Sequence, residues 1–555
     1  MQTKTESAAV LIVGVGPSGL ILALLLLRHD IPVRIIDKGP TFMVGQRGAG
    51  IMPRTQELYK ILGILPQVEK GSARVPKVRM YPSPEVEGQP PLKEYDMVEH
   101  FEEKPEYYRI NAVMFGQEDH QAMLREILSK EYGCHIELST ELVSFTPHPD
   151  HVVARVRNLK TFAEEKVRVD WLLGADGAHS VVRKQLGLTF LGETVDAVTL
   201  AIGDIEVLEG FDSEFWSMWG SHTDRMVTLR PYSRQGKNYH WFGVGGKNVD
   251  VPKVASDREM LLQHIHEIIG RKKFKYGEVR SAAPWKANIR MTDRFGQGRV
   301  FVAGDAAHIH SPTGGQGLNS GVQDSFNLAW KLALVHKGLA APSLLESYTT
   351  ERLPVIASML NQTTELMHKS FVSVAGDHRG WIRGWDLRQF GVNYRGSSVI
   401  LDERYTDTNE PVDPYRSSHD GTAHAGDRAS DAPGLVWNGE KKRLFDLLDS
   451  VSHTALFFCG EQPSTEAKGT LDFLSVHPRA RGVPMKTIVI YPQGNDSPKD
   501  LGMDYTFVDG DAYAYKHYCV KQGESWIVVV RPDGYIGAVV KGASGLRKYF
   551  QLVLQ

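Results

Sequence analysis

The chain has 555 residues, a length that indicates three or four folding units at about 100–200 residues per domain. Hydrophobic residues make up 42% of the chain and charged residues 23%, which excludes a collagen-like or wholly disordered protein. The 64 Lys and Arg nearly balance the 66 Asp and Glu, so no bulk basic charge is available to hold nucleic acid or an anionic membrane.

The three cysteines and one long apolar run are the sequence features that concern the cellular location of the protein. Cys134, Cys459 and Cys519 are far apart in sequence, which excludes a disulfide framework, a CxxC redox pair and a zinc cluster. Residues 8–27 are apolar and long enough for a membrane-spanning helix, but a glycine-rich turn at residues 14–19 divides them. We therefore expect a soluble, cytoplasmic protein that binds neither a membrane nor nucleic acid.

The N-terminal segment has the pattern of a dinucleotide-binding unit. Residues 10–13 predict a buried strand, residues 20–28 a helix and residues 33–36 a second strand. The turn between the first strand and the helix reads G-x-G-x-x-G, whose glycines let a pyrophosphate approach the positive end of the helix. An acidic residue at the tip of the second strand is placed to accept hydrogen bonds from ribose hydroxyls. The pattern alone does not distinguish NAD(P) from FAD. The predicted cofactor contacts in this unit are Gly14, Gly16, Pro17, Ser18, Gly19, Asp37 and Lys38.

Two later segments each place a polar turn after an apolar strand. Residues 171–174 lead into Asp176-Gly177, a pattern that by itself is typical of an ordinary turn. Residues 299–303 lead into Gly304-Asp305 and then into a glycine-rich loop before a helix at residues 320–334. A loop of this kind offers free N–H groups at the positive end of a helix to an anionic partner.

The three segments together resemble the group A flavin-dependent monooxygenases, the single-component FAD-dependent aromatic hydroxylases, over about residues 8–370. The resemblance implies an α/β fold, α+β overall, in which a Rossmann-like FAD-binding domain is interleaved with a β-sheet substrate domain. It implies bound FAD, NADPH or NADH as a transient co-substrate, and O2, with a phenolic ring hydroxylated through a flavin C4a-hydroperoxide. The further residues implied to contact the cofactor are Arg47, Gln117, Asp176, Gly304, Asp305, Pro312, Gly315, Gly317, Leu318 and Asn319.

The substrate site is predicted in the middle segment, about residues 191–290, which alternates apolar and polar residues and predicts a β-sheet. Activating a phenol with a pKa near 10 requires a base or a hydrogen-bond relay at neutral pH. The phenol hydroxylase branch carries an Asp for this purpose, but its counterpart here is Ala49, so the sequence does not identify the base.

The resemblance places an arginine and a tyrosine in a hairpin of this sheet. Arg230 would pair with a substrate carboxylate or phenolate, and Tyr239 or His240 would bond the hydroxyl. The alternative is that these strand residues only pack against their neighbours. Pro312 matches a proline beside the reactive edge of the flavin. The catalytic candidates are therefore Arg230, Tyr239, His240 and Pro312, and no metal site is predicted.

The C-terminal third differs in composition. The polar, aperiodic segment 376–434 predicts a linker on the surface, and apolar strands return after residue 443. The run Arg531-Pro532-Asp533-Gly534-Tyr535 predicts a hairpin turn between the last two strands. This part resembles the thioredoxin-like C-terminal domain of the phenol hydroxylase branch and implies a homodimer. The predicted domains are FAD-binding (1–75, 110–190 and 290–375), substrate-binding (76–109 and 191–289), linker (376–434) and thioredoxin-like (435–555).

The main functional hypothesis is hydroxylation of a phenolic substrate, with oxidative decarboxylation of a hydroxybenzoate as a variant. Epoxidation or quinone-forming oxidation of a larger aromatic or prenylated metabolite is a second possibility on the same scaffold. An FAD dehydrogenase without oxygen insertion and a flavin-bound protein without catalysis are the remaining alternatives. The sequence does not determine the substrate, the choice between NADH and NADPH, or the oligomeric state.

Overall fold

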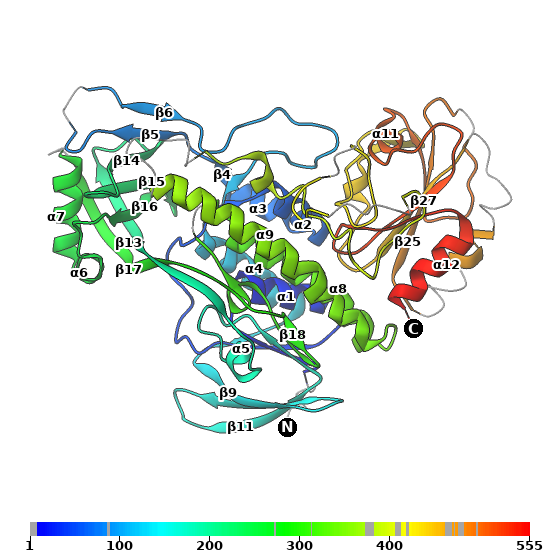
Figure 1. The fold of residues 1–555 in the computed structure, drawn as a ribbon, viewed down its shortest axis with the longest axis horizontal. Coiled ribbons are helices and arrows are strands. Elements are labelled where there is room, and N and C mark those ends of the chain that lie inside the picture. The colour runs from blue at the N-terminus through cyan, green and yellow to red at the C-terminus, as the bar shows by residue number, and fades with distance from the viewer. Residues whose placement is uncertain are drawn as a thin grey trace.

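The computed structural model describes residues 8–85, 89–270, 274–311, 314–371, 382–405, 412–417, 421–460, 469–470, 472–474, 482–495 and 498–554. Figure 1 shows three parts in a row: a β-sheet domain at one end, long helices at the centre and a C-terminal domain at the other end. Within the described residues, the structure holds no helix with the length and apolar character that crossing a bilayer requires.

A six-stranded, mostly parallel sheet forms the centre of the FAD-binding domain. Its strand order is β18-β19-β12-β1-β2-β8, and only the β18–β19 pair is antiparallel. The first strand is buried throughout because both faces of a parallel sheet are covered. In sheet order the strands are Gly296–Gln297, Val300–Val302, Trp171–Gly174, Val10–Val13, Val33–Ile36 and Ile136–Glu137.

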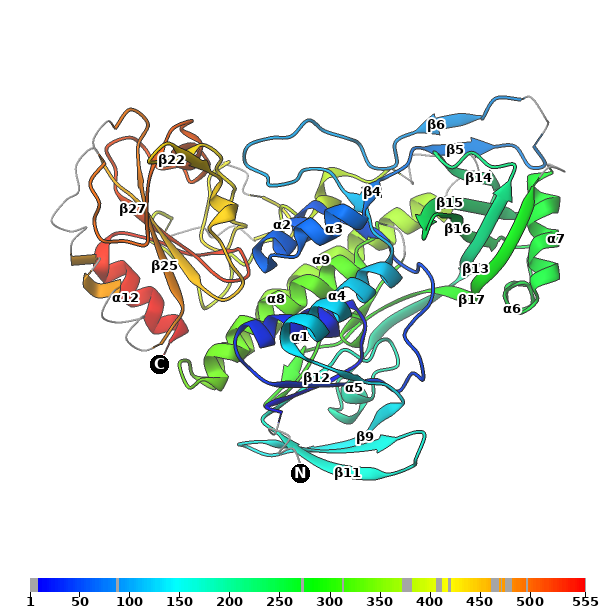
Figure 2. The ribbon, with the colours of Figure 1, turned by 180° about the vertical axis from the view of Figure 1, so that it is seen from behind.

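Helices cover one face of this sheet and a three-stranded antiparallel sheet lies on the other, as Figure 2 shows from behind. The helix α1 packs on both α8 and α4, and α9 packs along α8. The helices are α1 (Pro17–Arg28), α2 (Pro53–Leu62), α3 (Leu65–Gly71), α4 (Gln117–Tyr132), α5 (Val181–Gln185), α8 (Gly317–His336) and α9 (Glu346–Phe371). The small sheet contains β9 (Thr140–Pro147), β10 (Val152–Asn158) and β11 (Glu164–Val169).

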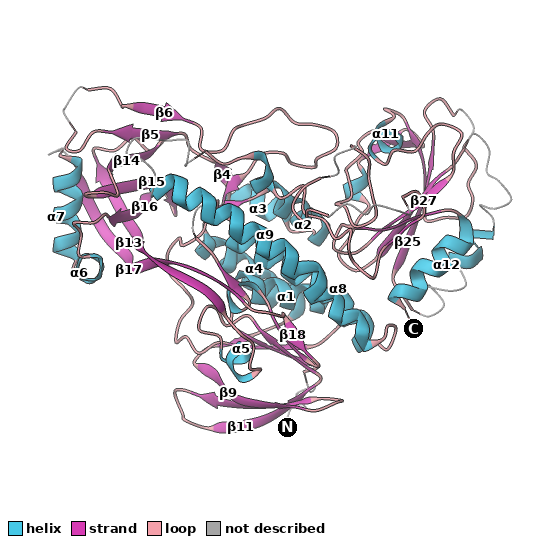
Figure 3. Cartoon of the chain, viewed as in Figure 1, coloured by secondary structure: helices cyan, strands magenta, loops and turns pink. Residues whose placement is uncertain are grey.

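The predicted substrate sheet is present and has eight strands in the order β20-β17-β13-β16-β15-β14-β5-β6. Two long antiparallel strands, β13 and β17, run from the FAD-binding domain into this sheet, as Figure 3 shows. The helices α6 (Val251–Ser256) and α7 (Arg258–Ile269) cover its outer face. In sheet order the strands are His308–Ile309, Lys275–Met291, Leu191–Glu209, Lys237–Gly245, Met226–Arg234, Trp216–Gly220, Val78–Tyr81 and Lys93–Tyr95.

Three two-residue strands form a small sheet of their own, in which β7 (Val113–Met114) pairs with both β3 (Gly50–Ile51) and β4 (Ala73–Arg74). They place the loop before β3 between the parallel sheet and the substrate sheet.

The C-terminal domain has the predicted thioredoxin-like arrangement. Strand β24 lies parallel to β25 and antiparallel to β27, and β27 pairs with β28 across the predicted hairpin. The helices are α11 (Tyr513–His517) and α12 (Gly542–Val553). In sheet order the strands are β21 (Leu401–Asp402), β28 (Ile536–Val540), β27 (Trp526–Val530), β24 (His453–Phe458), β25 (Met485–Tyr491), β26 (Tyr505–Asp509), β22 (Leu435–Trp437) and β23 (Glu440–Lys442).

The expected surface linker is wrong in one respect: the described part of residues 376–434 contains many buried side chains. Its aromatic side chains Phe390, Tyr394 and Tyr415 are 5%, 3% and 1% exposed. Its irregular backbone is satisfied by side chains, since the Asn393 amide donates to three carbonyl oxygens of this same segment. The segment also supplies β21, the edge strand beside β28. Aperiodic polar sequence therefore identified irregular backbone but not its burial.

Two buried histidines lie where the FAD-binding and C-terminal domains meet. The His29 ring nitrogen Nε2 lies 3.1 Å from the carbonyl oxygen of Ser450, and the His453 ring packs edge-on against Trp330. Burial lowers the pKa of His29 to about 4 and that of His453 to about 3.

These pKa values predict loss of stability in acid. The unfolded chain takes up protons near pH 6.5, while folded His29 and His453 stay neutral until about pH 4 and 3. Acidification below pH 6.5 therefore lowers the free energy of unfolding, by about 1.4 kcal/mol per pH unit for each group. We expect His453→Gln to flatten this dependence in chemical denaturation between pH 7 and pH 5. The exposed control His135→Gln should keep the wild-type slope, and an equal slope in all three proteins would contradict the assignment.

Candidate functional site

The turn after β1 is shaped for a phosphate group. Gly14 has φ +105°, and a Cβ there would lie 2.2 Å from the Ala175 carbonyl oxygen, so only glycine fits. A Cβ on Gly19 would meet the Gly14 carbonyl oxygen at 2.2 Å, which shows how closely α1 approaches the turn. Gly16, by contrast, faces open space with no atom within 4 Å of the Cβ position. No side chain caps α1, whose first N–H groups face that space.

Asp37 ends β2, as predicted, and stiffens the same turn. Its Oδ2 accepts a hydrogen bond from the Val15 N–H at 3.1 Å, and its Oδ1 accepts one from the Gly39 N–H at 2.7 Å. Each oxygen keeps a second lone pair for a ribose hydroxyl. The neighbouring Lys38 is exposed.

Asp176 caps a helix. Its Oδ2 accepts a hydrogen bond from the Val181 N–H at 2.6 Å and its Oδ1 one from the Ser180 hydroxyl at 2.5 Å, at the start of α5. From the same helix, Arg183 donates to the carbonyl oxygens of Ala306 at 3.0 Å and Ala178 at 2.8 Å. The Asp-Gly and Gly-Asp segments are thereby tied together through Arg183.

The Gly304-Asp305 turn lies at the end of β19. Gly304 has φ +59°, and its N–H donates to Asp324 Oδ2 at 3.1 Å. Asp305 is exposed, and within the described parts of the chain its carboxylate forms no hydrogen bond. A free carboxylate at this position is suited to bind the hydroxyls of a ribitol chain.

The glycine-rich loop ends at α8, whose N-terminus has no side-chain cap. Asn319 is buried, accepts from the Met52 N–H at 2.8 Å and donates to the carbonyl oxygens of Gly50 and Gly315. It therefore fixes the loop, and the N–H groups of residues 317–319 stay available for an anionic group. Gly317 lies against His310, because a Cβ there would be 2.8 Å from the ring nitrogen Nε2.

Gly315 and Leu318 complete the same loop, with Gly315 exposed and Leu318 partly buried. Pro312, which was predicted beside the reactive edge of the flavin, lies outside the described residues.

The loop before β3, residues 45–49, is held by acidic and amide side chains. The Gly45 N–H donates to Glu118 Oε2 at 2.7 Å, and the Gln46 N–H donates to Asp204 Oδ2 at 2.9 Å. The predicted flavin contact Gln117 accepts from the Gly48 N–H at 3.1 Å. Between these anchors the side chain of Arg47 is exposed and forms no ion pair with any described residue. The loop thus presents a free cation while its backbone is fixed.

These features fit FAD. The open space over Gly16 would admit a pyrophosphate, and the free carboxylate of Asp305 would accept hydrogen bonds from a ribitol chain. The uncapped N-terminus of α8 would stabilise the electron-rich end of a flavin ring.

A cavity of about 710 Å³ lies between the 45–49 loop and the substrate sheet. Ala49 and Gly116 line it from the FAD-binding domain, and β15 and β16 line it from the sheet. Three predicted catalytic residues border this cavity: Arg230, Tyr239 and His240. The structure therefore brings together residues that the sequence placed on two strands.

Arg230 is a buried cation that forms no direct ion pair with any described residue. It is 8% exposed and lies between the rings of Trp216 and Trp241, at 5.4 and 5.3 Å from their centres. Across the described ranges it forms neither a hydrogen bond nor an ion pair. Burial lowers its pKa to about 10, although the nearby Asp204 carboxylate acts in the opposite direction, so the guanidinium stays charged at neutral pH. Its N–H groups have no acceptor among the described residues and are therefore available to an anionic group of a ligand.

Strand alternation separates Tyr239 from His240. Tyr239 pairs with Tyr232 in register, and both rings stack on the face that carries Arg230. The His240 ring lies on the other face, edge-on to Phe211 with ring centres 4.9 Å apart. Burial lowers the pKa of His240 to about 4, so it is neutral. The two residues therefore cannot serve as alternatives for one contact.

Sequence reasoning missed polar groups that lie on the same face of the sheet as Arg230. Asp204 is 1% exposed, accepts from the Ser281 hydroxyl at 2.8 Å and lies beside Arg230 and Tyr232. Burial and the Asp204 carboxylate raise the pKa of Tyr232. The signal was the alternation along residues 200–207, in which Asp204 falls on the opposite face from Ala201, Ile205 and Val207.

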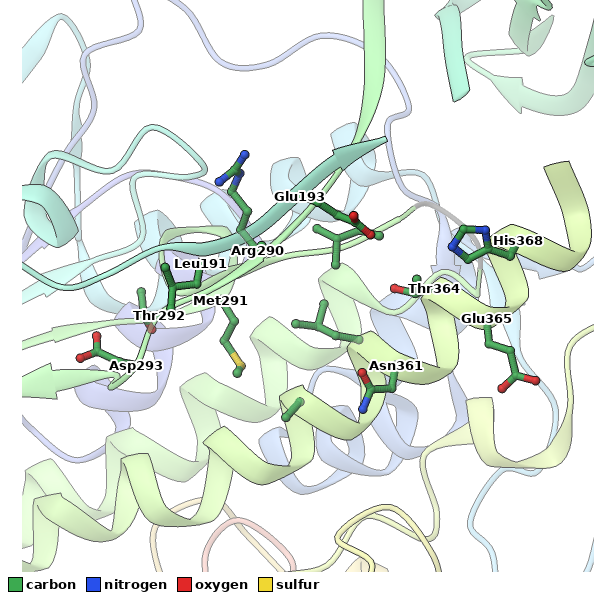
Figure 4. A pocket seen from close by; sticks show the side chains of 14 residues that line it. Leu191, Glu193, Arg290, Met291, Thr292, Asp293, Asn361, Thr364, Glu365 and His368 are labelled. Carbon is green, nitrogen blue, oxygen red and sulfur yellow. The ribbon is translucent and has the colours of Figure 1, made fainter. Parts of the chain in front are cut away.

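A second cavity, of about 860 Å³, lies between β13, β17 and α9 and is shown in Figure 4. None of the predicted site residues lines it. Figure 4 shows Asn361 and Thr364 projecting from α9, while Arg290 points away from that helix. Arg290 donates a hydrogen bond from Nε to Asn288 Oδ1 at 2.9 Å, and Glu365 forms an ion pair with Lys369. Because Arg230, Tyr239 and His240 line the smaller cavity and none of them lines this one, we take the smaller cavity as the candidate active site.

The comparisons with known proteins agree with this geometry. Residues 7–363 match the family described as FAD binding domain, and residues 440–555 match the phenol hydroxylase C-terminal dimerisation domain. The first match covers more than half of the chain, so the protein is an FAD-binding enzyme of this family.

Proteins of similar sequence define the class of FAD-binding enzyme more closely. A flavin-dependent monooxygenase of Mycobacteroides abscessus is 34% identical over 545 residues, covering 98% of this chain and 100% of that protein. Pentachlorophenol 4-monooxygenase of Sphingobium chlorophenolicum is 28% identical over 549 residues, covering 96% and 94%. The chain belongs to the flavin-dependent monooxygenases, which confirms the resemblance seen in the sequence.

Solved structures show the same fold. The flavin-dependent monooxygenase PieE, in complex with FAD and substrate, superposes with a TM-score of 0.80 at 22% identity, covering 99% of both chains. Aklavinone-11 hydroxylase, in a ternary complex with FAD and aklavinone, gives 0.78 at 22% identity, covering 100% of both.

Two glycine substitutions separate folding from cofactor binding. Gly14→Ala should lower the free energy of unfolding of the apoprotein by about 3 kcal/mol, because of its φ and the contact with Ala175. Gly16→Ala should leave apoprotein stability unchanged and weaken FAD binding about tenfold or more, because the methyl group enters the space over the turn. Denaturation of the apoproteins and flavin fluorescence titration check this, and unchanged FAD affinity in Gly16→Ala would contradict the placement.

Proposed function

We propose that this enzyme hydroxylates a phenolic aromatic substrate that is anionic when bound, using FAD, O2 and NADPH or NADH. The observation that carries the proposal is the buried, unpaired Arg230 in a cavity beside the loop of Arg47. Membership of the flavin-dependent monooxygenases supports the reaction type.

FAD, when bound, would supply the redox chemistry that links the nicotinamide, O2 and the ring. The residues described above would hold it, from the Gly14–Gly19 turn to Asp305 and the N-terminus of α8. Pro312 remains a proposed neighbour of the flavin by resemblance.

Arg230 binds the anionic group of the substrate, either a carboxylate or the phenolate oxygen. The flanking Trp216 and Trp241 keep water from the guanidinium and so strengthen the interaction. A cation within about 4–6 Å lowers the pKa of a neighbouring acid by roughly 1–3 units. Arg230 thereby favours the phenolate even though Ala49 supplies no base.

Tyr239 contacts the substrate hydroxyl. It shares a face with Arg230, lines the cavity and, across the described residues, has no hydrogen-bond partner of its own. Because the His240 ring packs against Phe211 on the other face, we assign the hydroxyl contact to Tyr239 and a packing role to His240.

The cavity size supports a second candidate substrate class. About 710 Å³ is in the upper part of the range for ligand pockets and exceeds the needs of one ring. A relative in Streptomyces rimosus is named 6-methylpretetramide 4-monooxygenase and is 34% identical over 367 residues, covering 65% of this chain and 62% of that protein. A larger aromatic substrate is therefore the alternative to a simple phenol or hydroxybenzoate.

We also propose a homodimer formed through the C-terminal domain, since its family is described as a dimerisation domain. The free cysteines fit a cytoplasmic location.

Product masses test the reaction. FAD-loaded enzyme with NADPH or NADH and O2 is offered simple phenols, hydroxybenzoates and polycyclic phenols. A gain of one oxygen establishes hydroxylation, and a gain of oxygen with loss of CO2 establishes oxidative decarboxylation. Nicotinamide oxidation with every compound but no oxygenated product would contradict the proposal.

Arg230→Met tests the anion site. Losing a charge-assisted hydrogen bond worth about 1.5–3 kcal/mol should raise KM for an anionic substrate about 10- to 100-fold. The free energy of unfolding should change little, because Arg230 forms no direct ion pair or hydrogen bond that the substitution would break, and Met avoids the burial of a charge. The matched control Arg225→Met, which breaks the exposed pair with Glu267, should leave KM unchanged. Equal KM values in all three proteins would move the anion site elsewhere.

A further inference from the structure

The hairpin turn Arg531–Tyr535 of the C-terminal domain is buried in the FAD-binding domain, although the proposed function gives it no role. Arg531 and Asp533 are 2% and 1% exposed. Trp330 of α8 donates from Nε1 to Asp533 Oδ2 at 3.2 Å, and Arg54 of α2 donates to the carbonyl oxygens of Asp533 and Gly534 at 3.0 and 3.1 Å. Figures 1 and 2 show the C-terminal domain beside α2 and α8.

Arg531 forms a two-point ion pair with Glu351 of α9. Its Nη1 and Nη2 lie 2.7 and 3.0 Å from the two carboxylate oxygens. Lys331 of α8 lies 2.7 Å from the same carboxylate, and all three side chains are fully buried. Burial alone would raise the pKa of Glu351, but Arg531 and Lys331 hold it well below its ordinary value.

The charges in this cluster balance. Arg531 and Lys331 are positive, and Glu351 and Asp533 are negative. Removing Arg531 would leave one excess negative charge at a fully buried position, and breaking a buried pair in this way is strongly unfavourable.

The next residue on α9, Arg352, holds the other end of a chain of contacts. Its Nε donates to Asp324 Oδ1 at 2.8 Å. Asp324 Oδ2 in turn accepts from the Gly304 N–H at 3.1 Å and lies 2.7 Å from His308 Nε2. Gly304 precedes Asp305, the carboxylate placed for the ribitol chain. Arg352 and Asp324 are also fully buried.

We propose that Arg531 is a positioning residue of the flavin site: by holding Glu351 it fixes α9, and Arg352 on the same turn then sets Asp324, Gly304 and Asp305. The docking of the C-terminal domain therefore determines FAD affinity. The proposal depends on FAD binding and not on the identity of the aromatic substrate.

Coupling through a rigid helix has a measurable size. Coupling free energies between two sites usually correspond to about 5- to 150-fold in affinity. We expect Arg531→Met to raise the FAD dissociation constant about tenfold, and Arg531→Lys, which keeps the charge but not the two-point geometry, to give an intermediate value. The matched control Lys548→Met breaks the Lys548–Glu403 pair, which is exposed at the lysine, in the same domain and should leave FAD affinity unchanged.

The test measures FAD binding by flavin fluorescence under conditions where circular dichroism shows each variant folded. A merely structural role lowers the free energy of unfolding but leaves the dissociation constant of the folded protein as in the wild type, which would overturn the proposal.

Hydrogen exchange of the full-length wild-type protein covers the case in which Arg531→Met does not fold. Because coupling is reciprocal, saturating FAD should slow amide exchange in residues 531–535 as well as around Gly304. Protection around Gly304 with no change in residues 531–535 would overturn the proposal.

Discussion

Four charged side chains, Arg531, Glu351, Lys331 and Asp533, form a buried cluster where α8, α9 and the C-terminal domain join. Each domain supplies one cation and one carboxylate: Lys331 and Glu351 come from the FAD-binding domain, and Arg531 and Asp533 come from the C-terminal domain. The two-point pair of Arg531 with Glu351 joins these two pairs across the domain boundary. A buried ion cluster of this kind contributes less through net stability than through the one arrangement that its geometry requires. The C-terminal domain is consequently part of the core of the FAD-binding domain rather than an appended unit.

The substrate cavity follows from a related constraint. Carboxylates of α4 and β13 hold the backbone of the 45–49 loop, and the same Glu118 that binds Gly45 also pairs with Arg280 of the substrate sheet. Loop and sheet are thereby fixed relative to each other, which defines the cavity between them. Within the cavity, the buried guanidinium of Arg230 forms no direct ion pair with a described residue. It is this buried guanidinium that would meet the anionic substrate that we propose.

The sequence predicted the local units well and their assembly less well. The strand, turn and helix around Gly14 could be predicted because glycine spacing and apolar runs are local signals, and so could the Arg531–Tyr535 hairpin. Pairing of Arg531 with Glu351, 180 residues away, leaves no local signal. The hydrogen bond from the Tyr415 hydroxyl to Gln316 Oε1, at 2.9 Å, also has no local signal in the sequence. It helps to bury a segment whose composition predicted a surface linker. Alternation along a strand places Tyr239 and His240 on opposite faces of the sheet, but the sequence did not show which face borders the cavity.

Incorporation of isotopic oxygen tests the central claim most directly: that this chain inserts one atom of O2 into an aromatic ring held by Arg230. The reaction is run in 18O2 with FAD-loaded enzyme, reduced nicotinamide and the substrate found by product analysis. The account predicts a ring product that carries one 18O atom, formed at a rate that falls strongly in Arg230→Met. A product whose new oxygen comes from water, or an 18O-labelled product formed equally fast without Arg230, would contradict it.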